Sequence, residues 1–169
     1  MITIGPAEAR DDDAIWSILE PILCDAETYA LPQHWSRAEA LGFWRGGSHA
    51  VFVAELPADA ASAAAPRVVG TYYLQPNQKG GGAHVANCGY ATLAKARGRG
   101  IARAMCLHSL DVARQQGFRA MQFNFVVATN EGAVALWKSL GFEVVGRLPR
   151  AFRHPALGLV DALVMYRAL

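Results

Sequence analysis

The residues best suited to chemistry lie in one short stretch, from Tyr90 to Ala102, where an apolar strand runs into a glycine-rich turn and a helix begins. The start of a helix leaves about four backbone N–H groups unpaired, and these groups carry a partial positive charge. Gly98 and Gly100 let such a backbone approach a ligand closely. Three arginines add positive charge: Arg97, Arg99 and Arg103. The pattern favours binding of a pyrophosphate, the alternative being a glycine-rich helix start with solvated arginines.

Histidine and cysteine show none of the spacings of a metal site. The three cysteines, Cys24, Cys88 and Cys106, include no C-x-x-C pair, and the five histidines form no H-E-x-x-H motif. We therefore predict no bound metal. Free thiols in a reducing, cytoplasmic compartment are the simplest interpretation of the cysteines.

The composition excludes several classes of protein. Of the 169 residues, 53% are hydrophobic and 18% are charged, so the chain is not disordered as a whole and is predicted to form one domain over residues 1–169. A net charge of +2 is too small to indicate nucleic-acid binding. No apolar run reaches the roughly 18 residues of a membrane span, and the acidic N-terminal segment is unlike a signal peptide. We expect neither nucleic acid nor a membrane among its partners.

Short strands and two helices are predicted for the first half of the chain. A strand is predicted at residues 2–4, and a helix at 12–24, where apolar residues recur every three or four positions after an acidic start. Ser36 and Glu39 form a capping box that begins a second helix, which the pair Gly46–Gly47 ends. Three strands follow, joined by a mobile hairpin loop at 57–66 and a second loop at 76–82: 50–56, 67–74 and 85–93.

Two longer helices and three further strands are predicted for the second half. The helices span 98–116 and 131–140 and end at Gly117 and Gly141. Strands are expected at 120–127, 142–146 and 159–166, with a loop at 147–158. Alternation along the first of these strands predicts two faces, one with Met121, Phe123, Phe125 and Val127 and the other with Gln122, Asn124 and Val126.

The predicted order is β-α-α-β-β-β-α-β-α-β-β. The early strands are joined by connections too short for a crossover, so parallel pairing is available only across the two late helices. We therefore predict an α/β (α+β) fold with a single mixed, mainly antiparallel sheet of about seven strands flanked by helices.

Two blocks of the sequence carry a family resemblance. Residues 97–102, Arg-Gly-Arg-Gly-Ile-Ala, match the pattern R/Q-x-x-G-x-G/A. A second block follows in the expected order: Asn130, Ala133, Leu136, Trp137 and Gly141-Phe142. From these blocks and the element order, the chain is identified as a member of the GCN5-related N-acetyltransferase (GNAT) superfamily. Segments 27–32, 123–126 and 148–165 further resemble a subgroup with fungal enzymes that act on proline analogues and bacterial members of unassigned substrate.

The resemblance implies that acetyl-CoA is the co-substrate and runs along the end of strand 85–93. Backbone groups of Ala91 and Thr92 would pair with its pantetheine arm, Asn130 would hydrogen-bond the same arm, and the pyrophosphate would lie on the amides of Gly98–Arg103. The cofactor-binding residues expected are Ala91, Thr92, Arg97, Gly98, Arg99, Gly100, Ile101, Ala102, Arg103, Asn130 and Trp137.

The reaction implied is direct attack of an amine on the thioester in a ternary complex. An alkyl ammonium of pKa near ~10.4 costs about 4–5 kcal/mol to deprotonate at pH 7, so the site must bind the neutral amine or supply a base. A backbone N–H near Thr92 would stabilise the oxyanion. Asn124 would face the gap between two diverging strands that holds the thioester.

The sequence departs from the family pattern in its acid and its base. Trp137 stands where the family usually has a tyrosine, and strand 85–93 lacks the glutamate that many members use. Proton transfer through water held by Asn87 and Asn124 is one hypothesis. Entry of a residue from the N-terminal segment is the other, and Glu27 is the candidate base, with a surface carboxylate as its structural alternative.

Four residues are candidates for binding the acceptor: Tyr29, Asn87, Asn124 and His154. His154 would contact a carboxylate of the acceptor together with Arg150 or Arg153, unless this is only a solvated basic loop. Tyr29 has a structural alternative as a plug between the first two helices, and Asn87 as a residue that satisfies a strand bulge.

These residues predict an N-acetyltransferase acting on the primary or secondary amine of a small, amino-acid-like molecule. Two alternatives stay open. One is a CoA-binding regulatory module without turnover, and the other is acetylation of a protein N-terminus or lysine. The resemblance also allows a homodimer formed through the C-terminal strands.

Overall fold

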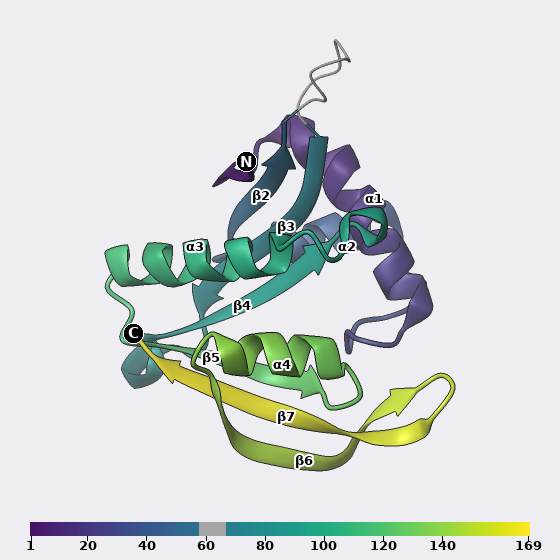
Figure 1. Cartoon of the computed structure of the whole chain (residues 1–169), viewed down its shortest axis with the longest axis vertical. Coiled ribbons are helices and arrows are strands. Elements are labelled where there is room, and N and C mark those ends of the chain that lie inside the picture. Colours follow the sequence, from purple (N-terminus) through teal and green to yellow (C-terminus); the bar gives the residue numbers. More distant parts are fainter. Residues whose placement is uncertain (58–66) are drawn as a thin grey trace.

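A computed structural model describes residues 1–57 and 67–169 (Figure 1). The strands are β1 (Thr3–Pro6), β2 (Ala50–Leu56), β3 (Arg67–Pro76), β4 (Val85–Thr92), β5 (Ala120–Val127), β6 (Glu143–His154) and β7 (Gly158–Ala168). The helices are α1 (Asp12–Asp25), α2 (Arg37–Trp44), α3 (Ile101–Gln115) and α4 (Glu131–Ser139), with 3-10 turns η1 (Ala9–Asp11), η2 (Gly80–Gly82) and η3 (Ala94–Ala96). Apart from Pro57, the hairpin loop predicted at 57–66 lies outside the described residues.

The strands form one mixed sheet in the order β1-β2-β3-β4-β5-β7-β6. Neighbouring strands are antiparallel except β4 and β5, which are parallel and are connected through α3. β7 lies between β5 and β6, so the connection through α4 passes over one strand. The predicted fold class is therefore confirmed.

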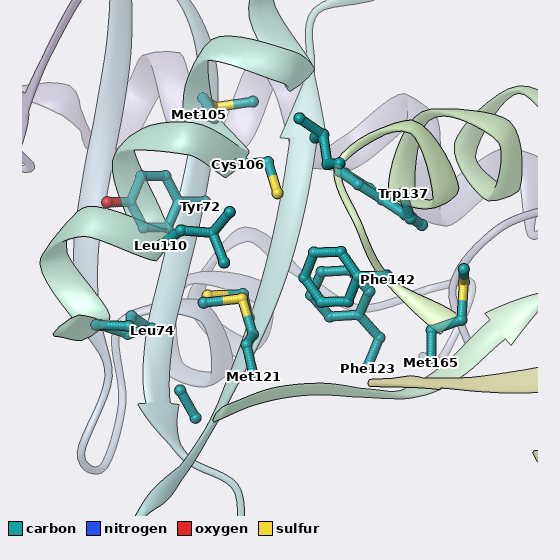
Figure 2. Packing of buried hydrophobic residues seen from close by; sticks show 14 of the residues in the cluster. Tyr72, Leu74, Met105, Cys106, Leu110, Met121, Phe123, Trp137, Phe142 and Met165 are labelled. Atoms are coloured by element: carbon teal, nitrogen blue, oxygen red, sulfur yellow. The ribbon is translucent and has the colours of Figure 1, made fainter. Parts of the chain in front are cut away.

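Helices α3 and α4 cover one face of the sheet (Figure 1), where they enclose the larger core. Met105 and Leu110 of α3 are fully buried there, and Trp137 of α4 packs beside them. The rings of Phe123 and Phe142 stack with centroids 4.3 Å apart (Figure 2). Burying a side chain of this size contributes about 1.5–3 kcal/mol, so this core fixes the positions of β4, β5 and both helices.

Helices α1 and α2 pack on the opposite face. Ile15 and Ile18 are buried against it, as their spacing predicts. Trp44 is also buried, and its indole N–H donates to Thr71 Oγ1 at 3.1 Å, while that hydroxyl donates to the Phe52 carbonyl at 2.9 Å. These two hydrogen bonds fix the end of α2 to the sheet.

The predicted capping box begins α2. The Ser36 hydroxyl accepts from the Glu39 N–H at 3.3 Å, and the Glu39 carboxylate accepts from the Ser36 N–H at 2.8 Å. The Ser36 hydroxyl and the Ser36 N–H both donate to the Glu39 carboxylate, and they lower the pKa of Glu39 below its usual value. No helix in the described ranges has the length and apolar character needed to cross a membrane.

A β-bulge in β5 breaks the alternation predicted for that strand. Between the paired residues Phe123 and Val126, two residues of β5 lie opposite a single residue of β7. The extra residue shifts the side-chain pattern by one position. Val126 therefore packs against the core, whereas the ring of Phe125 lies 6.2 Å from that of Phe152. The face predictions for Phe125 and Val126 are wrong for this reason.

The prediction of a loop at 147–158 is wrong, because β6 continues to His154 and β7 begins at Gly158, so only residues 155–157 form the turn of a long β6–β7 hairpin. Pairing continues beyond a three-residue bulge at 149–151, in which Arg150 has a φ of 53°. The Asp161 carboxylate accepts from the Arg150 N–H at 2.9 Å and pairs with Arg147 at 2.7 Å. The bulge removes the regular alternation that would have marked this strand in the sequence.

Helix α3 begins at Ile101 rather than at the predicted residue 98. Gly98 and Gly100 both have a φ of +77°. This left-handed conformation cannot continue a right-handed helix, so the glycines form a turn that leads into it.

Candidate active site

Strands β4 and β5 pair only at their beginnings and then diverge (Figure 1). Their parallel ladder ends at the pair Ala86 and Met121. At this point the side-chain amide of Asn87 donates to the Gln122 carbonyl at 2.9 Å. A continuing ladder would have needed that carbonyl for a backbone bond, so the Asn87 side chain ends the pairing at the place where a gap must open.

A cavity of about 880 Å³ opens where the two strands separate. It reaches from the beginnings of α3 and α4, past the ends of β4 and β5, to the segment between α1 and α2 and the end of β6. All of the predicted site residues except Arg99 line it: Glu27, Tyr29, Asn87, Ala91, Thr92, Arg97, Gly98, Gly100, Ile101, Ala102, Arg103, Asn124, Asn130, Trp137 and His154.

Free backbone amides define one end of this cavity, which we call the donor end. Within the described ranges, the amides of Gly98–Arg103 donate to no protein group. The flanking amides are engaged, because Arg97 donates to the Ala94 carbonyl at 3.2 Å and Ala104 to the Gly100 carbonyl at 2.9 Å. A run of free donors at a positive helix end suits a diphosphate ester, as the sequence predicts.

The three arginines of the turn have different places. Arg97 and Arg103 line the cavity, and Arg103 also donates to the Ser139 hydroxyl of α4 at 2.7 Å. Arg99 is exposed and does not line the cavity, because it sits on the turn between two glycines of positive φ. The Arg99 side chain lies outside the cavity, but its amide belongs to the free run of Gly98–Arg103, so its role in binding the cofactor stays a prediction.

Hydrogen-bond alternation decides which β4 backbone groups face the gap. The Leu93 N–H donates to the Val69 carbonyl at 2.9 Å, so odd-numbered residues of this strand point their backbone groups toward β3. The amides of Tyr90 and Thr92 therefore face the gap. The backbone of Ala91 faces β3, which corrects the expectation that it pairs with a pantetheine arm.

Asn130 and Trp137 form the α4 side of the cavity. Asn130 is the N-cap of α4, and its side-chain oxygen accepts from the Ala133 N–H at 3.4 Å, which leaves its NH₂ group for a ligand. The Trp137 ring lies 5.1 Å from that of Tyr90 and 5.2 Å from that of Phe123. The Trp137 ring is therefore packed into the wall of the cavity. Its indole N–H is a poor acid.

The opposite end of the cavity, which we call the acceptor end, is formed by residues 22–31, Phe43, Tyr73, Asn87, Asn124 and His154. The Tyr29 hydroxyl donates to the Tyr90 carbonyl at 2.7 Å. Burial raises the pKa of Tyr29 well above its ordinary value, so its hydroxyl stays protonated. Tyr29 thus lines the cavity and also anchors the α1–α2 segment on β4.

The two asparagines of the acceptor end differ in what they can offer. Asn87 is buried, and because its NH₂ group donates to Gln122, its side-chain oxygen is the atom left for a ligand. Asn124 is exposed; it donates to the Asn77 side chain at 2.6 Å and accepts from the Gln122 side chain at 2.8 Å. Asn124 lies at the gap as predicted, but both ends of its amide are engaged.

His154 contacts the cavity from the end of β6. Its Nδ1 accepts from the N–H groups of Ala156 and Leu157, at 3.2 Å and 3.3 Å, so the neutral ring carries its proton on Nε2. Arg150 and Arg153 do not line the cavity. His154 therefore lines the cavity without Arg150 or Arg153, and their joint contact with a carboxylate of the acceptor stays a prediction.

Cys88 lines the cavity but is not poised as a nucleophile. Burial raises the pKa of its thiol far above neutrality. Cys106 is buried nearby, and burial raises its pKa to about 11. Both thiols therefore stay protonated at neutral pH, and neither is poised to attack an acyl group.

Sequence reasoning missed Tyr73, which it assigned only to a strand. The structure places its side chain in the cavity wall, across Gly89 of β4. A Cβ at Gly89 would lie 2.5 Å from Tyr73 Cε1. A glycine inside a predicted strand marks a close approach of another group, so Gly89 was the available signal.

The comparisons with known proteins agree with this fold and cavity. The sequence matches the acetyltransferase (GNAT) family over residues 16–142. A GCN5-related N-acetyltransferase from Kribbella flavida is 41% identical, with a TM-score of 0.90 and coverage of 99% of this chain and 98% of that chain. The protein yncA from Salmonella typhimurium, solved with its cofactor acetyl-CoA, shares the fold, with a TM-score of 0.81, 20% identity and coverage of 100% and 94%.

A curated relative gives the same family. N-acetyltransferase aca1 from Schizosaccharomyces pombe is 34% identical over 98 residues, which are 57% of this chain and 47% of the relative. The match therefore spans about half the length of that relative. Fold and cavity together define an acetyltransferase-like protein with a splayed strand pair. The chain belongs to the acetyltransferase (GNAT) family.

Proposed function

We propose that the protein transfers the acetyl group of acetyl-CoA to the amine of a small, amino-acid-like acceptor, by direct attack in a ternary complex. The observation that carries this proposal is the continuous cavity, which joins the free amides of Gly98–Arg103 to a partly enclosed acceptor end. One end suits a diphosphate ester, and the other is large enough for a second small molecule.

The donor end would hold acetyl-CoA, which supplies the acetyl group as an activated thioester. The amides of Gly98–Arg103 would take its diphosphate, and Arg97 would add charge beside it. The free NH₂ group of Asn130 would donate to the pantetheine arm. The Thr92 amide, which faces the gap, would stabilise negative charge on the acetyl oxygen.

The acceptor end would present a neutral amine to that thioester. Removing a proton from an alkyl ammonium costs about 4–5 kcal/mol at pH 7, so a proton acceptor is needed. The Asn87 oxygen would accept an amine N–H, and Glu27, exposed at the rim of the cavity, would take the proton through water. This arrangement is supported by the positions of Asn87 and Glu27, which line the same end of the cavity.

A second candidate has one specific observation in its favour. Asp25 and Glu27 are exposed carboxylates at the acceptor end, whereas the lysine and arginine side chains that line the cavity, Arg97 and Arg103, come from the turn and helix of the donor end. A negative rim suits a cationic peptide, so acetylation of a protein N-terminus or lysine is the alternative acceptor class.

Thiol release from acetyl-CoA tests the proposal against both alternatives. We expect the protein to release free thiol with small amines, including amino acids and amino-acid amides, faster than with an equal concentration of a lysine-containing peptide. Faster turnover of the peptide would favour the protein acetyltransferase. Tight binding of CoA by calorimetry without turnover of any amine would indicate a regulatory module and contradict an enzyme.

Three further proposals concern the whole chain. We propose that residues 1–169 act as one acetyltransferase domain, because strands from β1 to β7 share one sheet.

A cytoplasmic location is supported by the free cysteines, Cys24, Cys88 and Cys106. A homodimer is supported by the outer edge of β6, where Val144, Val145 and Leu148 are exposed, and sedimentation analysis would test it.

A further inference from the structure

Three tyrosines line the cavity, and one of them keeps its hydroxyl free. The Tyr29 hydroxyl donates to the Tyr90 carbonyl, and the Tyr90 hydroxyl bonds to the Ser109 hydroxyl, both at 2.7 Å. Tyr73 Oη has no hydrogen-bond partner among the described residues. Among those residues, the one buried side-chain polar atom without a hydrogen bond is Asp12 Oδ1, which is ion-paired with Arg45 at 3.0 Å. Tyr73 Oη is therefore not sealed, and it is reachable from the cavity that its side chain lines.

The backbone places this hydroxyl at the edge of the gap. Tyr73 pairs with Gly89 in the β3–β4 ladder, and its ring extends across that glycine. A Cβ at Gly89 would lie 2.9 Å from Tyr73 Oη, so the oxygen lies above β4, next to the gap. Asn87 is two residues from Gly89 and projects from the same face of the strand.

Aromatic neighbours hold the Tyr73 ring in this position. The His49 ring stacks on it, with centroids 4.3 Å apart and planes 5° from parallel. The Trp44 and Phe43 rings contact it edge-on, at 5.0 Å and 6.1 Å. Because these contacts surround the ring, the O–H group is directed into the cavity.

The hydroxyl is a donor across the physiological pH range. Burial raises the pKa of Tyr73 to about 12, and the nearby Cys88 thiol adds to the rise. A phenol that holds its proton so firmly is a poor acid for a leaving thiolate, whose pKa is near ~8.5. It is, however, a neutral hydrogen-bond donor that costs free energy if a bound ligand leaves it unpaired.

The acceptor end of the cavity therefore offers two hydrogen-bonding groups on the same face of the sheet. The Tyr73 O–H can donate a hydrogen bond, and the Asn87 side-chain oxygen can accept one. We propose that Tyr73 positions the acceptor by donating a hydrogen bond to a carbonyl-type oxygen that the acceptor carries near its amine, while Asn87 accepts the amine N–H. This inference rests on the proposed function. It narrows the substrate class to amines that bear a carboxyl or amide oxygen, and it disfavours simple alkyl amines.

Tyr73→Phe tests the inference, because it removes one oxygen atom and keeps the ring. The adjacent Tyr72→Phe is the matched control, since Tyr72 lies on the opposite face of the sheet and its hydroxyl bonds to His108 Nδ1 at 2.7 Å. The probes are L-alanine, L-alaninamide and ethylamine, with kcat/KM measured for each by thiol release. Ratios between wild type and variant cancel the different basicities of these amines.

We expect the wild type to prefer an oxygen-bearing amine over ethylamine. Tyr73→Phe should reduce that preference about tenfold or more through a higher KM for the acceptor, with CoA affinity by calorimetry and thermal stability near those of wild type. Tyr72→Phe should keep the preference. The comparison of alanine with alaninamide shows whether the oxygen belongs to a carboxylate or to a neutral carbonyl.

Three outcomes would overturn the inference in different ways. An active enzyme that keeps its preference after Tyr73→Phe would overturn the role of Tyr73 and leave the proposed function intact. A wild type that prefers ethylamine would overturn the role of Tyr73 and the amino-acid-like acceptor class, and would leave only acetyl transfer to an amine. A wild type that binds CoA but releases no thiol with any of the three amines would overturn the proposed function, and this inference with it.

Discussion

Single residues set the chemistry of the donor end through backbone conformation. At Gly98 and Gly100, a Cβ would meet no heavy atom within 4 Å, yet both have a φ of +77°. Glycine is therefore required at these positions by conformation and not by space. The same turn leaves the amides of Gly98–Arg103 without partners among residues 1–57 and 67–169. Glycine content and position in the sequence predicted this feature, whereas the direction of the Arg99 side chain depends on the folded turn.

Gly100→Glu should abolish CoA binding and leave the protein folded. The new carboxylate would stand where a diphosphate must lie, and like charges at short range repel strongly. Gly117→Glu is the matched control, because Gly117 has a φ of +84° and equally open surroundings at the other end of α3. Both variants carry a similar backbone strain of about 1 kcal/mol. Calorimetry should show loss of CoA binding for Gly100→Glu alone, and unchanged affinity would remove the turn from the site.

Interactions between elements shaped the parts of the fold that sequence patterns missed. The bulge in β5 exchanges the environments of Phe125 and Val126. The bulge in β6 disrupts the alternating sequence pattern of this strand, which continues to His154. In both cases the neighbouring strand determines the register. The alternation of apolar and polar residues along a single strand does not reveal that register, so the bulges could not be predicted from it.

Asp161→Ala should loosen the β6–β7 hairpin around its bulge. The Arg150 N–H and the Arg147 side chain lower the pKa of Asp161 below its usual value. A lowered carboxyl pKa stabilises the fold above the ordinary pKa of 3.8, and this contribution is lost as the pH falls through the folded value. We expect the Arg150 amide to exchange its hydrogen several-fold faster in Asp161→Ala by NMR. An unchanged rate would show that the bulge holds without the carboxylate.

In the whole molecule, two layers of helices pack against the two faces of one sheet, and the candidate site lies at the gap between β4 and β5. α3 and α4 bury one face and α1 and α2 the other (Figure 1). The gap between β4 and β5 interrupts this packing, so it can receive a ligand without unfolding either core. A partly buried contact on the α3 face, from Tyr72 to His108, also makes the stability of the fold depend on pH.

Thermal stability should fall between pH 7.5 and pH 5.5 because of His108. Burial lowers the pKa of His108 below its ordinary value of 6.5, against a smaller opposite effect of Asp111. The unfolded chain then binds more protons near pH 6, so stability rises with pH in this range and is lost as the pH falls below 6.5. In His108→Gln, Tm should change less between the two pH values than in wild type. Equal changes by calorimetry would contradict this role.

The sequence by itself determined the order of the elements, the mixed sheet and the open turn before α3. These features depend on local signals, because periodicity, capping boxes and glycine positions act within a few residues. Tertiary structure alone decided which residues meet in the cavity. The Tyr73 ring crosses Gly89, Asn87 ends the β4–β5 ladder, and Asp161 accepts a hydrogen bond from the Arg150 N–H across the β6–β7 bulge. Each of these contacts joins separate strands, and its energy depends on a register that only the complete sheet establishes.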